Sequence, residues 1–205
     1  MSVTYPKGFR AAGVAAGLKA SGNKDVALVV NDGPAPVSAG VFTSNRIKAA
    51  PVLWTAQCAQ TTDFRAVILN SGGANACTGP EGFADTHHTA EHVAQLLNIA
   101  PIEVAVCSTG LIGKRLPMDL LTAGIAQAAD ELSTESGHDA AEAIMTTDSV
   151  AKTSTYDSIA GWKVGGMAKG AGMLAPGLAT MLVVITTDAV INRELADSAL
   201  RGATN

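Results

Sequence analysis

The chain has 205 residues, of which 47% are hydrophobic and 16% are charged. Such a chain can bury a core that offsets its ordering entropy, which excludes a globally disordered protein. Its formal net charge is −4 and no basic stretch runs along it, which excludes the electrostatic footprint of a nucleic-acid-binding protein. Glycine is abundant, with 21 residues, whereas 4% of residues are aromatic, so small side chains are expected to fill the core.

Short β-like runs alternate with helical ones along the chain, which predicts an α/β or α+β fold. The continuous apolar run Val26–Val30 is typical of a strand that is buried on both faces. In the first 110 residues we expect five strands and one helix, Ala84–Leu97. The expected strands are Val26–Val30, Val37–Thr43, Pro51–Thr55, Arg65–Leu69 and Glu103–Cys107.

The second half of the chain contains the clearest helical pattern, Pro117–Leu132. Pro117 suits a first helical turn, and apolar residues then recur at steps of three and four. We expect four further elements after it. These are a short helix at Asp139–Met145, a glycine-rich turn region at Val164–Gly172, a strand at Thr180–Thr187 and a helix at Glu194–Arg201.

Cysteine usage and the apolar segments bear on the compartment. The three cysteines, Cys58, Cys77 and Cys107, are sparse and far apart, which does not suit a disulfide framework and indicates a cytoplasmic protein. The apolar run Ala11–Leu18 is interrupted by glycines, unlike the core of a signal peptide. The uncharged stretch Gly170–Thr187 contains glycine, proline and threonine, so no membrane segment is expected.

Two short motifs suggest chemistry that their context does not favour. His88-Thr89-Ala90-Glu91-His92 has the H-x-x-E-H spacing of some zinc enzymes, but nothing marks a third ligand, and a solvated helix face is the favoured interpretation. The glycine run Gly165–Gly172 contains Lys169 but matches neither phosphate-loop nor dinucleotide-binding templates. We therefore expect neither a metal nor a bound nucleotide.

Three other segments carry hydroxyl groups in places that suit catalysis. Ser108-Thr109-Gly110 follows a predicted strand, where small residues can stabilise an oxyanion, although an ordinary strand-to-loop turn is the favoured interpretation of this motif alone. Thr146-Thr147-Asp148 ends a predicted helix. Ala179-Thr180 lies at the start of a predicted strand in the layout of a self-cleaving precursor, in which a freed N-terminal threonine carries its own amine base. From this layout alone, a buried strand threonine is the favoured interpretation.

Read in order, five blocks of this sequence resemble the ornithine acetyltransferase family, also called bifunctional glutamate N-acetyltransferases of the ArgJ type. The resemblance extends over nearly the whole chain. The blocks are N-S-G-G-A-N-A-C-T-G (Asn70–Gly79), C-S-T-G-L-I-G (Cys107–Gly113), I-M-T-T-D (Ile144–Asp148), G-G-M-A-K-G-A-G-M-L-A-P (Gly165–Pro176) and L-A-T-M-L (Leu178–Leu182).

The resemblance implies an acetyltransferase of arginine biosynthesis that moves acetyl from N-acetylornithine to glutamate through an acetyl-threonine. It implies self-cleavage between Ala179 and Thr180, with Thr180 as nucleophile and its free amine as base. Thr109 and Gly110 match the oxyanion-stabilising pair. Thr146, Lys169 and Thr180 match substrate-binding positions, where Lys169 suits a carboxylate. No bound cofactor is implied, and acetyl-CoA is a candidate co-substrate for acetylating glutamate.

The resemblance also implies a layered αββα-type sandwich with mixed sheets, as in self-processing aminopeptidases. Residues 1–179 correspond to an α-subunit region and residues 180–205 to the start of a β-subunit. Because family members continue further, the chain is expected to be a fragment or a truncated product, and an α/β heterotetramer with the rest of the β-subunit is expected. Two alternatives stay open: a related self-processing amidohydrolase or aminopeptidase, and an inactive fragment that only associates with a partner subunit.

Overall fold

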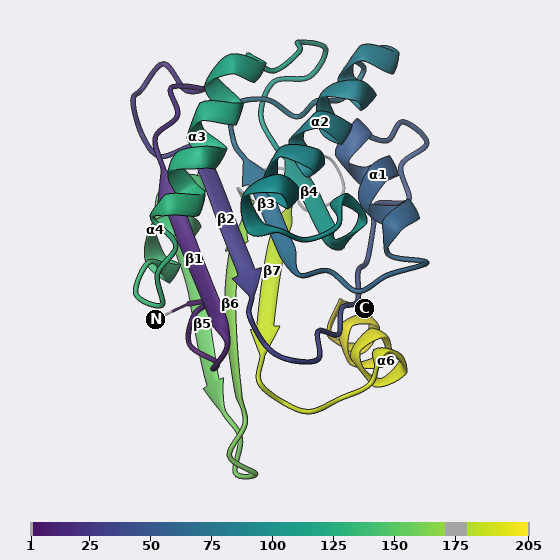
Figure 1. Cartoon of the computed structure of the whole chain (residues 1–205), viewed down its shortest axis with the longest axis vertical. Coiled ribbons are helices and arrows are strands. Elements are labelled where there is room, and N and C mark those ends of the chain that lie inside the picture. Colours follow the sequence, from purple (N-terminus) through teal and green to yellow (C-terminus); the bar gives the residue numbers. More distant parts are fainter. Residues whose placement is uncertain (1, 171–179, 205) are drawn as a thin grey trace.

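The computed structural model describes residues 2–170 and 180–204 and consists of two stacked sheets with helices (Figure 1). The first sheet has the order β1-β2-β3-β4, and the second has the order β5-β6-β7. The strands are β1 (Phe9–Val14), β2 (Val26–Asn31), β3 (Ala66–Asn70), β4 (Val104–Ser108), β5 (Lys152–Asp157), β6 (Lys163–Lys169) and β7 (Leu182–Thr187). The helices are α1 (Ala50–Cys58), α2 (Gly79–Leu97), η1 (Pro101–Glu103, a 3-10 turn), α3 (Met118–Asp130), α4 (Gly137–Ala143) and α6 (Arg193–Thr204).

The first sheet separates two hydrophobic cores, and alternation along β2 shows how. Val26, Leu28 and Val30 face the core formed with α1, α2 and α3, whereas Ala27 and Val29 face α4 and the second sheet. All five residues of Val26–Val30 are buried, so the strand predicted from this apolar run is confirmed. In Figure 1 helices α1, α2 and α3 lie in front of the first sheet, and the second sheet lies behind it.

The first sheet is mixed, because β3 pairs with β4 in parallel while β1, β2 and β3 are antiparallel neighbours. The predicted α/β class with mixed sheets is therefore confirmed. In the described residues the layers run helix, sheet, sheet. The strand β5 and alternate residues of β7, including Val183 and Ile185, are exposed on the far face of the second sheet.

One predicted strand is wrong, because Pro51–Thr55 lies in helix α1. Pro51 occupies the first turn, where its missing N–H is tolerated. The helix packs against the outer edge of β4: Trp54 Nε1 donates to the Val104 carbonyl at 3.0 Å. Thr55 Oγ1 both donates to the Val106 carbonyl at 2.9 Å and accepts from the Val106 amide at 3.0 Å. These tertiary contacts outweigh the local preference of the segment for an extended conformation.

Two further expectations also need correction. The segment Val37–Thr43 forms no strand, since it pairs with no other strand in the described part of the chain. The predicted turn region Val164–Gly172 is a strand up to Lys169, because Lys163–Lys169 is β6 at the centre of the second sheet. At Gly165 a Cβ would lie 2.1 Å from the Ser2 carbonyl oxygen, so glycine allows close packing here and does not make a turn.

The remaining predicted elements agree with the structure except at their ends, whereas β1, β5 and η1 were not predicted. Helix α2 begins at Gly79, before the predicted Ala84, and α3 and α4 end slightly earlier than predicted. Strand β7 begins at Leu182, and helix α6 extends to Thr204. The apolar run Ala11–Leu18 contributes its first half to β1. No helix in residues 2–170 and 180–204 combines the length and the apolar character needed to cross a membrane.

Candidate functional site

Lys169 is the centre of a buried polar cluster at the end of β6. Its side chain has a relative exposure of 5%. Its ammonium donates to Thr146 Oγ1 at 2.6 Å, to Thr109 Oγ1 at 3.3 Å and to the Thr180 carbonyl at 3.4 Å. Four of the residues singled out in the sequence thus lie together.

Thr109 and Gly110 follow β4, at the carboxyl ends of the parallel pair β3 and β4. The Thr109 amide donates to the Asn70 carbonyl at 3.0 Å, so the hydroxyl rather than the amide of Thr109 can face a ligand. Because the hydroxyl accepts from Lys169, its own proton can be donated elsewhere. The amide of Gly110 donates to no other described residue. These two donors are the ones that could stabilise an oxyanion.

The geometry of Gly110 requires glycine. Its φ of +131° lies in a region that residues with a side chain rarely adopt. A Cβ at this position would lie 2.9 Å from the amide nitrogen of Gly73. The loop after β3 and the loop after β4 therefore touch through their backbones beside the Lys169 cluster.

Asn70 holds these two loops in place. Its Nδ2 donates to Ser108 Oγ at 2.7 Å, and its Oδ1 accepts from the amides of Gly72 and Gly73 at 3.3 and 3.4 Å. Asn70 is 3% exposed. In the sequence, Asn70 is part of the motif block Asn70–Gly79, and no role was predicted for it. The signal that could have found it is an Asn-Ser-Gly-Gly turn directly after a buried strand.

Asp148 shapes the loop that carries Thr146. It accepts from the Gly170 amide at 2.8 Å and the Thr146 amide at 3.1 Å, and it pairs with the Lys152 ammonium. Burial alone would raise the pKa of Asp148, but the hydrogen bonds from Lys152, Gly170 and Thr146 outweigh it and lower the pKa to about 2. Asp148 is therefore a fixed anion that ties the ends of α4 and β6 together.

Lys169 keeps a positive charge that no carboxylate contacts directly among the described residues. Desolvation lowers its pKa, the negative charge of Asp148 raises it, and the charge of Lys152 lowers it further. A buried cation held by neutral hydroxyls is suited to bind a ligand carboxylate.

Thr180 lies at the start of the segment that leads into β7, with its side chain exposed. Its carbonyl oxygen contacts Lys169, which places its main chain at the cluster. Ala179, the other residue of the predicted cleavage site, lies outside the described residues.

The structure gives other roles to the two motifs that suggested a zinc site or a phosphate-binding loop. His92 Nε2 lies 3.2 Å from the Thr122 carbonyl, and Glu91 pairs with His87 rather than with the other two histidines. Within the described residues no group of three His, Cys, Asp or Glu side chains is placed to hold a metal. Gly165 and Gly166 of the glycine run belong to strand β6, and Gly170 directly follows that strand.

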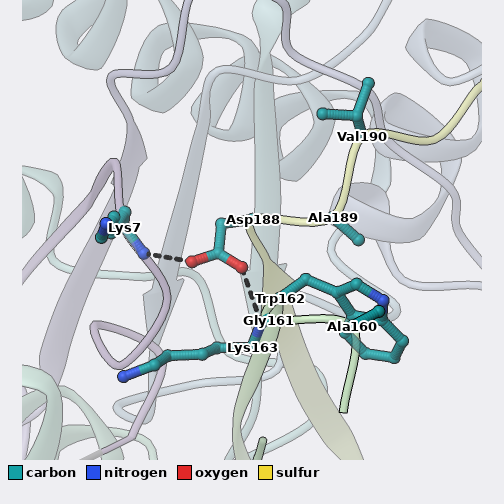
Figure 2. Close-up of a pocket in the computed structure, with 8 residues that line it drawn as sticks. All are labelled: Lys7, Ala160, Gly161, Trp162, Lys163, Asp188, Ala189 and Val190. Atoms are coloured by element: carbon teal, nitrogen blue, oxygen red, sulfur yellow. Dashed lines mark hydrogen bonds between the residues drawn. The ribbon is translucent and has the colours of Figure 1, made fainter. Parts of the chain in front are cut away.

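An open pocket lies at the opposite end of β6, away from Lys169 (Figure 2). It is lined by Trp162, Val190 and the loop around Gly161. Asp188 in its wall accepts from the amides of Lys7 and Lys163 at 3.0 and 2.6 Å, as Figure 2 shows. This carboxylate serves to join the N-terminal segment to the second sheet, and the pocket lining contains none of the threonines singled out in the sequence. The Lys169 cluster is therefore the candidate site.

The two-sheet architecture is similar to that of ornithine acetyltransferases. The ornithine acetyltransferase of Mycobacterium tuberculosis, solved in complex with ornithine, matches with a TM-score of 0.84 and 61% identity over 88% of this chain and 96% of that chain. The arginine biosynthesis bifunctional protein ArgJ of Bacillus halodurans matches with a TM-score of 0.77 and 39% identity, over 89% of this chain and 95% of that chain.

The chain belongs to the ArgJ family, whose family model matches residues 10–205. The arginine biosynthesis bifunctional protein ArgJ of Streptomyces coelicolor is 64% identical over 204 residues, which are 100% of this chain and 53% of that protein. The protein of the same name from Mycobacterium tuberculosis is 62% identical over 98% of this chain and 52% of its own length. The family seen in the sequence motifs is thus confirmed, and the chain spans about half the length of the curated relatives it matches.

Proposed function

We propose that this chain is part of an acetyltransferase of arginine biosynthesis that transfers acetyl from N-acetylornithine to glutamate through an acetyl group on Thr180. The observation that carries the proposal is the contact of one buried ammonium, that of Lys169, with Thr109, Thr146 and Thr180. These residues come from three separate segments, and each matches a functional position implied by the family resemblance.

The first step would be self-cleavage between Ala179 and Thr180. The Thr180 hydroxyl attacks the Ala179 carbonyl carbon, the peptide bond to the Thr180 nitrogen breaks, and that nitrogen takes the proton. Water then hydrolyses the resulting ester, which leaves a carboxylate on Ala179 and a free hydroxyl and amine on Thr180. The new amine has an ordinary pKa of about 7.7–8.0 and can act as general base near neutral pH.

In the transfer, Thr180 Oγ attacks the acetyl carbon of N-acetylornithine and its proton passes to the Thr180 amine. The Thr109 hydroxyl and the Gly110 amide would stabilise the tetrahedral oxyanion. Ornithine leaves with that proton. The amine of glutamate then attacks the acetyl carbon, the ester bond to Thr180 Oγ breaks, and the proton lost by that amine passes through the Thr180 amine to Oγ as N-acetylglutamate leaves. Lys169 and Thr146 would bind substrate, with the ammonium of Lys169 on a carboxylate.

The lengths of the relatives support cleavage at this position. This chain covers 52% of the Mycobacterium tuberculosis relative but 96% of the chain matched in the crystal structure from that organism. A precursor that is divided into two chains of similar length accounts for the difference. We accordingly assign residues 1–179 to an α-subunit region and residues 180–205 to the start of a β-subunit, with an α/β heterotetramer as the expected assembly.

Self-cleavage is tested by intact-mass spectrometry of the wild-type chain and Thr180→Ala. We expect the wild type to give two masses that sum to the precursor plus one water, and Thr180→Ala to give one uncut species, because the nucleophile is gone. Thr155→Ala, which changes an exposed threonine on β5, should be cut like the wild type. Cleavage of Thr180→Ala would disprove the assignment of Thr180.

The acceptor distinguishes transfer from hydrolysis. A transferase consumes N-acetylornithine in proportion to added glutamate, whereas an amidohydrolase or aminopeptidase turns over with water alone. The relatives are called bifunctional, which supports acetyl-CoA as a second acetyl donor. Formation of N-acetylglutamate from acetyl-CoA and glutamate would test that donor. An uncut and inactive chain would support the third possibility, a fragment that only associates with its partner subunit.

A further inference from the structure

Lys19 lies in the turn between β1 and β2, which a buried carboxylate holds in one conformation. Asp25 is fully buried and accepts hydrogen bonds from the amides of Ala16 at 2.7 Å, Leu18 at 2.6 Å and Lys19 at 3.0 Å. Three amide donors on one carboxylate fix the path of the turn. These hydrogen bonds therefore fix the backbone position from which the Lys19 side chain extends.

This turn packs against the candidate site. The side chain of Leu18 lies so close to Gly72 that a Cβ on Gly72 would be 2.3 Å from the Leu18 Cβ. The Lys19 ammonium donates to the Met145 carbonyl at 2.9 Å. Met145 directly precedes Thr146, which accepts from Lys169 at 2.6 Å. Two ammonium groups thus contact consecutive residues of one loop.

The nearby carboxylates do not contact either ammonium. Asp25 is occupied by three amides, and Asp148 is occupied by Lys152 and two amides. Burial lowers the pKa of Lys19, the charge of Asp25 raises it, and the charge of Lys169 lowers it. The charge of Lys169 thus acts on Lys19, and the two ammonium groups, bound to consecutive residues of one loop, add positive charge at the cluster.

We propose that Lys19, held on the Met145 carbonyl, is a second cation of the Lys169 site. Its charge strengthens the binding of a substrate carboxylate and so favours ligands that carry a carboxylate over ligands that do not. This inference rests on the proposed function for the identity of the ligand, an amino acid carboxylate. Lys19 is a specificity-determining residue and takes no part in bond making or breaking.

The first experiment follows the titration of Lys169 by NMR in protein labelled with 13C at the lysine Cε, with Lys169→Arg to assign its signal. Asp148 and Lys152 act on the pKa of Lys169, and the charge of Lys169 acts in turn on the pKa of Lys19. In Lys19→Met the pKa of Lys169 should rise, because a neighbouring cation that disfavours its charged form has been removed. Lys19→Arg keeps the charge and should keep the wild-type value.

A matched control is Lys24→Met, which removes a lysine of the same segment. Lys24 pairs with Asp139 and Glu142, both in α4, so its charge is already compensated and the titration of Lys169 should not change. This readout needs no acetyl transfer, so failure of the proposed function would leave it intact. An unchanged pKa of Lys169 in Lys19→Met, or the same change in Lys19→Arg, would overturn the proposal.

The second experiment compares two ligands by calorimetry: ornithine, and 1,4-diaminobutane, which has the same two amines and no carboxylate. In Lys19→Met we expect the Kd of ornithine to rise about three- to tenfold, and the affinity for the diamine to be unchanged or tighter. Lys19→Arg should restore ornithine binding. Equal weakening of both ligands would indicate general distortion of the site and would also overturn the proposal.

Discussion

At the scale of single residues, the site depends on glycine and threonine at positions where no other residue fits equally well. Lys169 is neutralised by no direct carboxylate contact among the described residues, and three threonines supply its hydrogen bonds instead. Gly110 combines a positive φ with backbone contact to Gly73. Both features keep a cation and an amide donor available to a ligand while leaving little room for side chains.

Gly110→Ala tests the importance of this backbone contact. A Cβ 2.9 Å from the Gly73 nitrogen forces the two loops apart, so we expect self-cleavage and acetyl transfer to fall at least about a hundredfold. Gly113→Ala is the control, because Gly113 also has a positive φ, +80°, but nothing lies within 4 Å of the added Cβ. The control should lose about 1 kcal/mol of stability and keep its cleavage rate. Cleavage rates from timed intact-mass spectra decide between them, and equal rates would contradict the prediction.

At the scale of elements, helix α1 shows why a local pattern misleads. Its sequence is β-branched and apolar enough to predict a strand at Pro51–Thr55. The helix forms because Trp54 and Thr55 then satisfy the outer backbone groups of β4, an edge strand that would otherwise bury unpaired carbonyls. By contrast, the strand predicted at Val26–Val30 agrees with the structure, because its own side chains are apolar on both buried faces. The helix predicted at Pro117–Leu132 also agrees, because its own side chains supply one apolar face.

Thr55→Val removes the hydroxyl that bonds both the carbonyl and the amide of Val106 while it keeps the shape of the side chain. Two buried backbone groups lose their partner, so we expect the free energy of unfolding to fall by about 2–4 kcal/mol. Thr61→Val changes an exposed threonine just after the same helix and should cost less than about 1 kcal/mol. Urea unfolding monitored by circular dichroism measures both, and a loss under 1 kcal/mol for Thr55→Val would refute the edge-strand explanation.

At the scale of the whole molecule, the two sheets and the N-terminal segment meet through small residues. Gly165 of β6 lies against the backbone of Ser2, and Met167 and Val184 of the second sheet pack against Val29 and Leu69 of the first. The abundance of glycine and the scarcity of aromatic residues therefore have a structural reason: close backbone packing replaces large rings at these contacts.

Two adjacent glycines of β6 test this packing. In Gly165→Ala the new Cβ would lie 2.1 Å from the Ser2 carbonyl oxygen, so we expect a loss of about 2–4 kcal/mol in the free energy of unfolding. In Gly166→Ala the nearest atom is the Val184 carbonyl oxygen at 3.7 Å, and stability should change by less than about 1 kcal/mol. Thermal unfolding of the two variants should rank them in this order, and the reverse ranking would refute the packing argument.

The sequence by itself determined the α/β class, most of the strands and helices, the family and a short set of candidate residues. These follow from local periodicity and from motif blocks that can be read in order along one chain. The tertiary structure alone decided that Lys169 meets threonines 60, 23 and 11 residues away, that Asn70 and Asp148 hold their loops, and that Lys19 lies beside them. Such contacts depend on how two sheets and their connecting loops pack, and no local pattern encodes a distance between segments that far apart.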